Sequence, residues 1–118
     1  MDLIKGQKAV VIGKRHNPQL GTYLTGPYIV KVKRINKNSY SIAYEDGEDY
    51  YPTLFCAGSG IAKKDSDCVY GSMSYALYTP EMAIAELKCF ANAEKDPNGY
   101  RAEKYRKNMD FIKAEFGL

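Results

Sequence analysis

Alternating apolar and polar residues predict β structure in the first half of the chain. Strands are expected over Lys8–Ile12, Tyr28–Ile35 and Ser39–Tyr44, because β-branched and aromatic residues are frequent in all three and alternate with small or polar residues in the third. The acidic segment Glu45–Glu48 contains Gly47 and predicts a hairpin turn, followed by a return strand over Asp49–Leu54. This order favours a small antiparallel sheet.

Two stretches break this alternation. Gly13–Pro27 contains several Gly and Pro turn signals and the only histidine, so we expect a long mobile loop there. Between residues 56 and 78 the pattern is less regular. Cys68–Tyr70 and Met73–Tyr78 alternate well enough to predict one or two further strands.

The last third of the chain follows a helical period instead. Thr79 and Pro80 provide an N-cap and a first-turn proline before an apolar stripe, and Asp96–Gly99 predicts the stop. A second helix is expected from Tyr100. Its apolar line has spacings of three and four and consists of Ala102, Tyr105, Met109, Ile112 and Phe116. Two helices joined by a short turn predict an antiparallel pair packed on the sheet.

Composition fits one domain, and the charge is unevenly distributed. The chain has 118 residues, of which 45% are hydrophobic, and a formal net charge of +3. Residues 1–57 hold eight bases and five acids, whereas residues 58–118 hold nine of each. The positive excess therefore lies entirely in the β-patterned half, which predicts an anionic partner.

The basic residues of that half are the first candidate site. No carboxylate occurs from Leu3 to Tyr44. Lys31 and Lys33 share one strand face, whereas alternation places Arg34 on the opposite face. The alternative interpretation is a solvated face or a protected edge strand. The residues expected to neutralise phosphates are Lys14, Arg15, Lys31, Lys33 and Lys37.

Tyrosine is the second candidate feature, with eleven in the chain. A tyrosine ring can stack on a base or hold a cation, and its hydroxyl tolerates the boundary with water. Tyr40 and Tyr44 flank Ile42 on one strand face and are expected to pack inward. The candidates for an exposed recognition surface are Tyr23, Tyr28 and Tyr50.

Other classes of function find little support in the sequence. His16 is the only histidine and lacks an orienting context, and no nucleophile elbow or complete phosphate loop occurs. The three cysteines do not space like a zinc site, and the acidic turn lacks calcium-loop spacing. We therefore predict a non-catalytic protein without metal or cofactor. No apolar run suggests a membrane span, and unpaired cysteines favour a reducing, cytoplasmic location.

Three segments carry a resemblance to a known fold. Lys5–Val11, Gly26–Val30 and Ser39–Gly47 resemble the successive strands of small SH3-like barrels. The Tudor-like branch shows an aromatic strand ending in an acidic-Gly turn and implies an aromatic cage for methylated Lys or Arg. The C-terminal barrel of retroelement integrases has a Gly-Pro-aromatic entry to its second strand and implies contact with nucleic acid.

The expected fold is therefore an α+β single domain. Residues from about 4 to 78 would form a small antiparallel SH3-like β-barrel or bent sheet, and residues from about 79 to 117 a C-terminal helical hairpin that covers one side. The helical pair belongs to neither branch of the resemblance.

The expected function is binding of a nucleic-acid backbone through the basic, tyrosine-rich barrel surface. Two alternatives stay open. One is a protein-interaction or inhibitor module that docks on a protein partner, as some virus-encoded accessory proteins do, or that holds a methylated side chain. The other is a pocket for a small anionic nucleotide.

Overall fold

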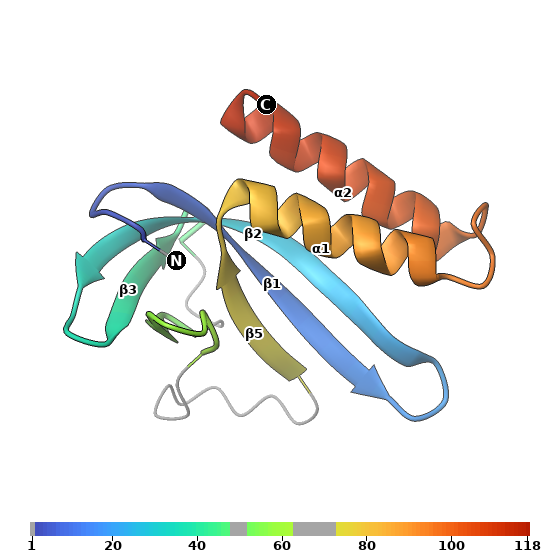
Figure 1. The fold of residues 1–118 in the computed structure, drawn as a ribbon, viewed down its shortest axis with the longest axis horizontal. Helices are drawn as coiled ribbons and strands as arrows, with labels where there is room; N and C mark the ends of the chain where they lie inside the picture. The colour runs from blue at the N-terminus through green and yellow to red at the C-terminus, as the bar shows by residue number, and fades with distance from the viewer. Residues whose placement is uncertain (1, 48–51, 63–72) are drawn as a thin grey trace. The chain divides into compact units, whose positions relative to one another are not determined.

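Residues 2–47, 52–62 and 73–118 are described in a computed structural model of the chain (Figure 1). The first 78 residues contain a five-stranded sheet in which hydrogen-bonded neighbours follow the order β4-β3-β2-β1-β5. All four pairings are antiparallel. The strands are β1 (Lys8–Asn17), β2 (Gly21–Ile35), β3 (Ser39–Tyr44), β4 (Leu54–Cys56) and β5 (Met73–Tyr78).

A short segment after β4 nearly closes this sheet into a small barrel. Ile61 and Ala62 form isolated bridges, Ile61 with Ala76 of β5 and Ala62 with Phe55 of β4. The amide of Cys56 donates to the carbonyl of Ile61 at 2.9 Å, and the amide of Ala62 donates to the carbonyl of Tyr75 at 2.9 Å. The two outer strands of the sheet are therefore linked through residues 61–62.

Alternation along the strands fills the interior of the barrel. Successive side chains of a strand point to opposite faces, so every second residue points inward. Phe55 is completely buried, and Tyr40 and Tyr44 pack inward as predicted. The core cluster consists of Leu3, Ala9, Val11, Val30, Val32, Tyr40, Ile42, Tyr44, Phe55, Tyr75 and Leu77. This set fixes which side chains of β1, β2 and β3 point outward.

The expected loop over Gly13–Pro27 is wrong, because most of it forms paired strand. β1 and β2 continue their pairing to Asn17 opposite Gly21, and only residues 18–20 form the turn. The side-chain oxygen of Asn17 accepts the amides of Gln19 and Leu20 at 2.8 and 2.9 Å, which stabilises this turn.

The Gly-Pro pair marks an irregularity within β2 rather than its entry. Register jumps from Val11 opposite Tyr28 to Gly13 opposite Thr25, so Gly26 and Pro27 together oppose one residue of β1. A bulge suits proline, which has no amide to donate to the ladder. The dipeptide that resembled a strand entry therefore lies in the middle of a long strand.

The other strand predictions have mixed outcomes. The strands over Ser39–Tyr44 and Met73–Tyr78 are confirmed as β3 and β5. Of the return strand predicted over Asp49–Leu54, only Leu54 among the described residues lies in a strand, and it begins β4, which continues to Cys56. Residues 48–51 and the possible strand over Cys68–Tyr70 lie outside the described residues.

Both predicted helices are confirmed, as α1 (Pro80–Ala93) and α2 (Tyr100–Phe116). The hydroxyl of Thr79 caps α1 by accepting the amide of Met82 at 3.3 Å. The helices pack side by side, and the rings of Phe90 and Tyr105 meet edge to face at 6.2 Å between centroids. The buried positions of the pair are Pro80, Ala83, Leu87, Ala91, Ala102, Tyr105 and Ile112.

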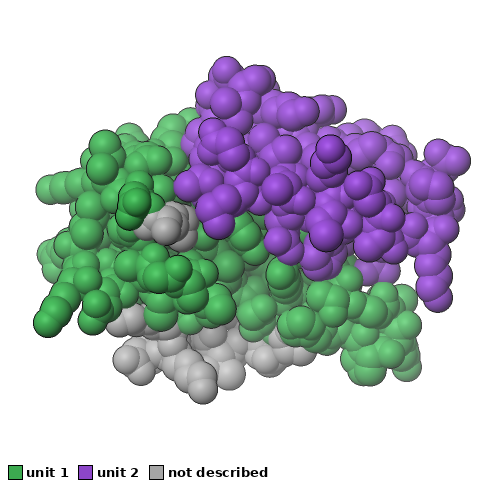
Figure 2. Space-filling model, viewed as in Figure 1, with its two compact units in different colours: residues 1–78 green, residues 79–118 purple. Residues whose placement is uncertain are grey.

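The structure divides into two compact units, residues 1–78 and residues 79–118 (Figure 2). The fold class is thus confirmed as α+β, with a small barrel-like antiparallel sheet followed by a helical pair. In the described part of the chain, neither helix is long and apolar enough to cross a bilayer. The single-domain organisation, the covering of the barrel by the helices and the cytoplasmic location stay predictions.

Candidate anion-binding face

The outward side of β1 and β2 carries four cationic side chains, which we call the basic face: Lys8, Lys31, Lys33 and Arg34. Because Ala9 and Val30 point into the core, their neighbours Lys8 and Lys31 point outward. Lys8 and Lys31 lie directly opposite each other in the β1–β2 register. Ala43 of β3 is the other cross-strand partner of Lys31 and leaves it open on that side.

The pairing of two lysines across antiparallel strands is unfavourable for folding. Like charges directly opposite each other lower stability, whereas an opposite pair would raise it by roughly 0.2–1 kcal/mol. The chain nevertheless places Lys8 and Lys31 at facing positions. The register therefore concentrates positive charge here, which is the pattern expected of a surface that meets an anion.

A bulge in β2 adds Arg34 to this face and overturns the prediction from alternation. Register shifts between Val32, which pairs with Ile42, and Arg34, which pairs with Ser41, so Lys33 is the extra residue. Lys33 and Arg34 are both exposed and line the same pocket. Arg34 consequently does not follow Val30 and Val32 into the core.

No described carboxylate pairs with the cations of β2. Among the described residues, the side chains of Lys31, Lys33 and Arg34 make no hydrogen bond or ion pair. The bases of α2 differ. Arg101 lies 3.4 Å from Glu94, Lys107 lies 3.3 Å from Glu103, and Arg106 donates to the carbonyl of Pro97 at 2.8 Å. Among the described residues, the cations of β2 therefore have no polar partner, whereas three bases of α2 bind groups of the helical unit itself.

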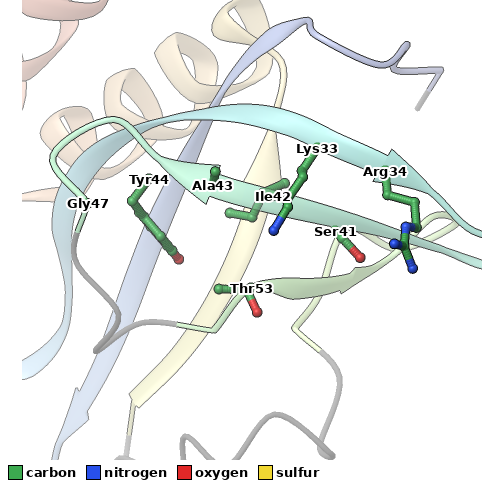
Figure 3. A pocket seen from close by; sticks show the side chains of 8 residues that line it. All are labelled: Lys33, Arg34, Ser41, Ile42, Ala43, Tyr44, Gly47 and Thr53. Atoms are coloured by element: carbon green, nitrogen blue, oxygen red, sulfur yellow. The ribbon is translucent and has the colours of Figure 1, made fainter.

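A pocket of about 400 Å³ adjoins the basic face at β3 (Figure 3). Lys33 and Arg34 extend from β2 across β3, where Ser41 and Ala43 form part of the wall. Among the described residues, the lining consists of Lys33, Arg34, Ser41, Ile42, Ala43, Tyr44, Gly47 and Thr53. It thus combines two cations with hydroxyl groups and small side chains.

The other predicted bases do not all join this face. Lys37 is exposed in the turn that follows β2, at the same end of the sheet. Lys14 pairs with Leu24, which lies roughly 20 Å from Lys31 along β2 at the usual rise per residue. Arg15 pairs with Tyr23 and Met73 beyond it. The structure therefore brings Lys31 and Lys33 together and places Lys14 and Arg15 elsewhere.

The predicted tyrosine surface is also divided. Tyr28 is half-buried against the core, and its ring meets that of Tyr44 edge to face at 6.3 Å between centroids. Tyr23 is half-buried beside Arg15, away from the basic face. Tyr50 lies outside the described residues. Neither described candidate stands in the pocket wall, which contains Tyr44 instead.

Sequence reasoning missed Lys8 and Arg34. Lys8 begins a predicted strand and could have been placed opposite Lys31 once the register of the hairpin was known. The bulge turns Arg34 to the outward face of the sheet, and nothing in the sequence Lys33-Arg34-Ile35 predicts a bulge. Among the described residues, no group of three potential metal ligands lies together.

Comparison with known proteins adds no further information on this site. Neither the protein-family models, nor the curated proteins, nor the solved structures contain a match to this chain. The SH3-like resemblance therefore stays a prediction from the sequence, and any function has to be argued from the residues themselves.

Proposed function

We propose that this protein is a non-catalytic module that binds nucleic acid through its phosphate backbone, with the basic face as the contact surface. One observation carries the proposal: adjoining strands present Lys8, Lys31, Lys33 and Arg34 on one side, and the three cations of β2 make no internal ion pair among the described residues. Phosphate contacts of Lys and Arg supply most of the affinity in binding that is independent of sequence.

The geometry supports backbone contact more than base stacking. Tyr23 and Tyr28 were expected to stack on bases, but neither lines the pocket and Tyr28 packs against the core. Lys37 extends the positive surface at the turn after β2. The proposed role of the face is therefore charge neutralisation, without a prediction of sequence preference.

The test is the salt dependence of binding to a fluorescent single-stranded oligonucleotide, measured by anisotropy. Affinity is expected to fall steeply between low and moderate salt. The double variant Lys31→Gln/Lys33→Gln is expected to reduce the slope of log K against log salt by about 1.4, since each lost phosphate contact removes about 0.7 on a single strand.

A matched control is available in the helical unit. Lys88→Gln/Lys104→Gln removes the same charge from two exposed lysines of α1 and α2 and is expected to leave the slope near the wild-type value. Equal losses in the two double variants would show that only net charge matters. An affinity for the oligonucleotide that does not change with salt concentration would contradict the proposal and favour docking on a protein partner.

A further inference from the structure

The pocket beside β3 combines two adjacent cations with hydroxyl groups in one concave site. Lys33 and Arg34 are consecutive residues whose side chains line one concave site because of the bulge. Without a described carboxylate in contact, two adjacent cations repel each other. A ligand that carries two negative charges on one group relieves that repulsion best.

Hydroxyl groups in the wall add directional hydrogen bonding. The oxygen of Ser41 accepts the side-chain amide of Asn36 at 3.1 Å, which leaves the hydroxyl hydrogen of Ser41 for a ligand. Thr53 is exposed, and its side chain makes no hydrogen bond among the described residues. The hydroxyl of Tyr44 instead donates to the carbonyl of Pro52 at 2.6 Å, which holds this ring as a fixed wall.

The described part of the acidic turn, residues 45–47, borders the pocket. Glu45 and Asp46 precede Gly47 and are exposed, but only Gly47 belongs to the lining. The amide of Glu45 donates to the carbonyl of Ile29 at 3.0 Å, which fixes the backbone of the turn to β2. Among the described residues, the polar side chains that line the pocket are therefore cations and hydroxyls, as an anion requires.

We propose that this pocket binds the terminal phosphate of a nucleic-acid strand, an inference that rests on the function proposed above. A terminal phosphomonoester carries up to two charges and three acceptor oxygens, whereas an internal phosphodiester carries one charge. The Arg34 guanidinium can take two of these oxygens in a bidentate contact, and Lys33 supplies the second charge. Lys31 and Lys8 lie along the same face to receive the phosphates that follow.

The test compares short single-stranded DNA oligonucleotides of one sequence that carry a 5′-phosphate, a 3′-phosphate or hydroxyls at both ends. One phosphorylated form is expected to bind about tenfold more tightly than the hydroxyl form, which corresponds to one charge-assisted contact. Arg34→Lys keeps the charge but loses the planar fork, so the preference is expected to shrink to about twofold or less. Thermal melting of this variant checks that it is folded.

Lys31→Gln is the matched control, because Lys31 does not line the pocket. This variant is expected to weaken all three oligonucleotides equally and to keep the preference for a phosphorylated end. Equal affinity of the wild-type protein for the three oligonucleotides would overturn the terminal-phosphate site while the salt-dependent binding stands. Absence of binding to every oligonucleotide at low salt would overturn the proposed function as well.

A free nucleoside monophosphate separates the two sources of a phosphomonoester. The strand-end assignment predicts that adenosine monophosphate competes only weakly, because it cannot reach Lys8 and Lys31 while it occupies the pocket. Competition at the same concentration as the phosphorylated oligonucleotide would overturn the strand-end assignment.

Discussion

The half of hairpin β1–β2 near the chain start pairs Lys8 with Lys31, whereas the half near its turn pairs Lys14 with Leu24 and Arg15 with Tyr23. We call these the proximal and distal halves. Both are basic in sequence. In the proximal half the cations lie on one outward face beside a pocket, and in the distal half the β2 partner of each cation is apolar or aromatic. The register therefore decides whether the cations gather on one face of the sheet.

In the distal half, neighbouring side chains pack closely against the backbone at Gly13. A Cβ at Gly13 would lie 2.5 Å from the hydroxyl oxygen of Thr25 and 3.0 Å from the side chains of Met73 and Tyr75. Gly13→Ala is therefore expected to lower the free energy of unfolding by roughly 1–3 kcal/mol through overpacking. Urea denaturation measures this loss.

Gly58→Ala is the matched control for this experiment, because its Cβ would meet nothing within 4 Å. We expect a change in unfolding free energy of less than about 0.5 kcal/mol for this surface position. Oligonucleotide binding of folded Gly13→Ala is expected to keep the wild-type salt slope. A smaller salt slope in folded Gly13→Ala would show that the distal half also contributes to oligonucleotide binding.

The turn of the distal half depends on Asn17. Asn17→Ala removes the acceptor for the amides of Gln19 and Leu20 and is expected to cost about 1 kcal/mol. Gln19→Ala changes an exposed side chain of the same turn and is expected to be nearly neutral. Equal destabilisation by both variants would mean that the Asn17 oxygen does not hold the turn.

The proximal half predicts a change of opposite sign. Lys31→Glu replaces the facing pair with an opposite-charge pair to Lys8, so stability is expected to rise by roughly 0.2–1 kcal/mol while oligonucleotide binding is lost. Lys31→Gln should lie between wild type and Lys31→Glu in both measurements. If Lys31→Glu lowers the free energy of unfolding, then repulsion between Lys8 and Lys31 does not destabilise the wild-type protein.

The smallest effect is expected from the cations of the distal half. Lys14→Gln/Arg15→Gln is predicted to change stability by less than about 0.5 kcal/mol and to leave the salt slope of oligonucleotide binding unchanged. The sequence predicts both residues as phosphate contacts, whereas the structure places them away from the basic face. If this variant reduces the salt slope of oligonucleotide binding as much as Lys31→Gln/Lys33→Gln does, then Lys14 and Arg15 also contact phosphates.

Local signals were sufficient for part of this structure. The Thr79-Pro80 start and the apolar stripes of α1 and α2 define both helices, because a helix forms through contacts within the segment. The strand β3 likewise follows from its alternation. These elements needed no knowledge of distant partners.

Pairing between segments distant in sequence accounts for what was missed. Gly13–Pro27 contains turn residues and predicts a loop, yet β5 and the two strands of the hairpin pair along most of it. The bulge at Lys33 and the facing of Lys8 with Lys31 are properties of the register, which is set by the whole sheet. The candidate bases were therefore recognisable in the sequence, but their grouping was not.

The link through residues 60–62 occupies backbone groups at the β5 edge that could otherwise pair with a strand of another chain. A sheet that ended at β4 and β5 would offer two rows of open backbone groups, which are templates for strands of other chains. The amides of Ala62 and Leu77 instead donate to the carbonyls of Tyr75 and Gly60, so part of the β5 edge is occupied from within. We therefore expect that loosening this link would promote aggregation.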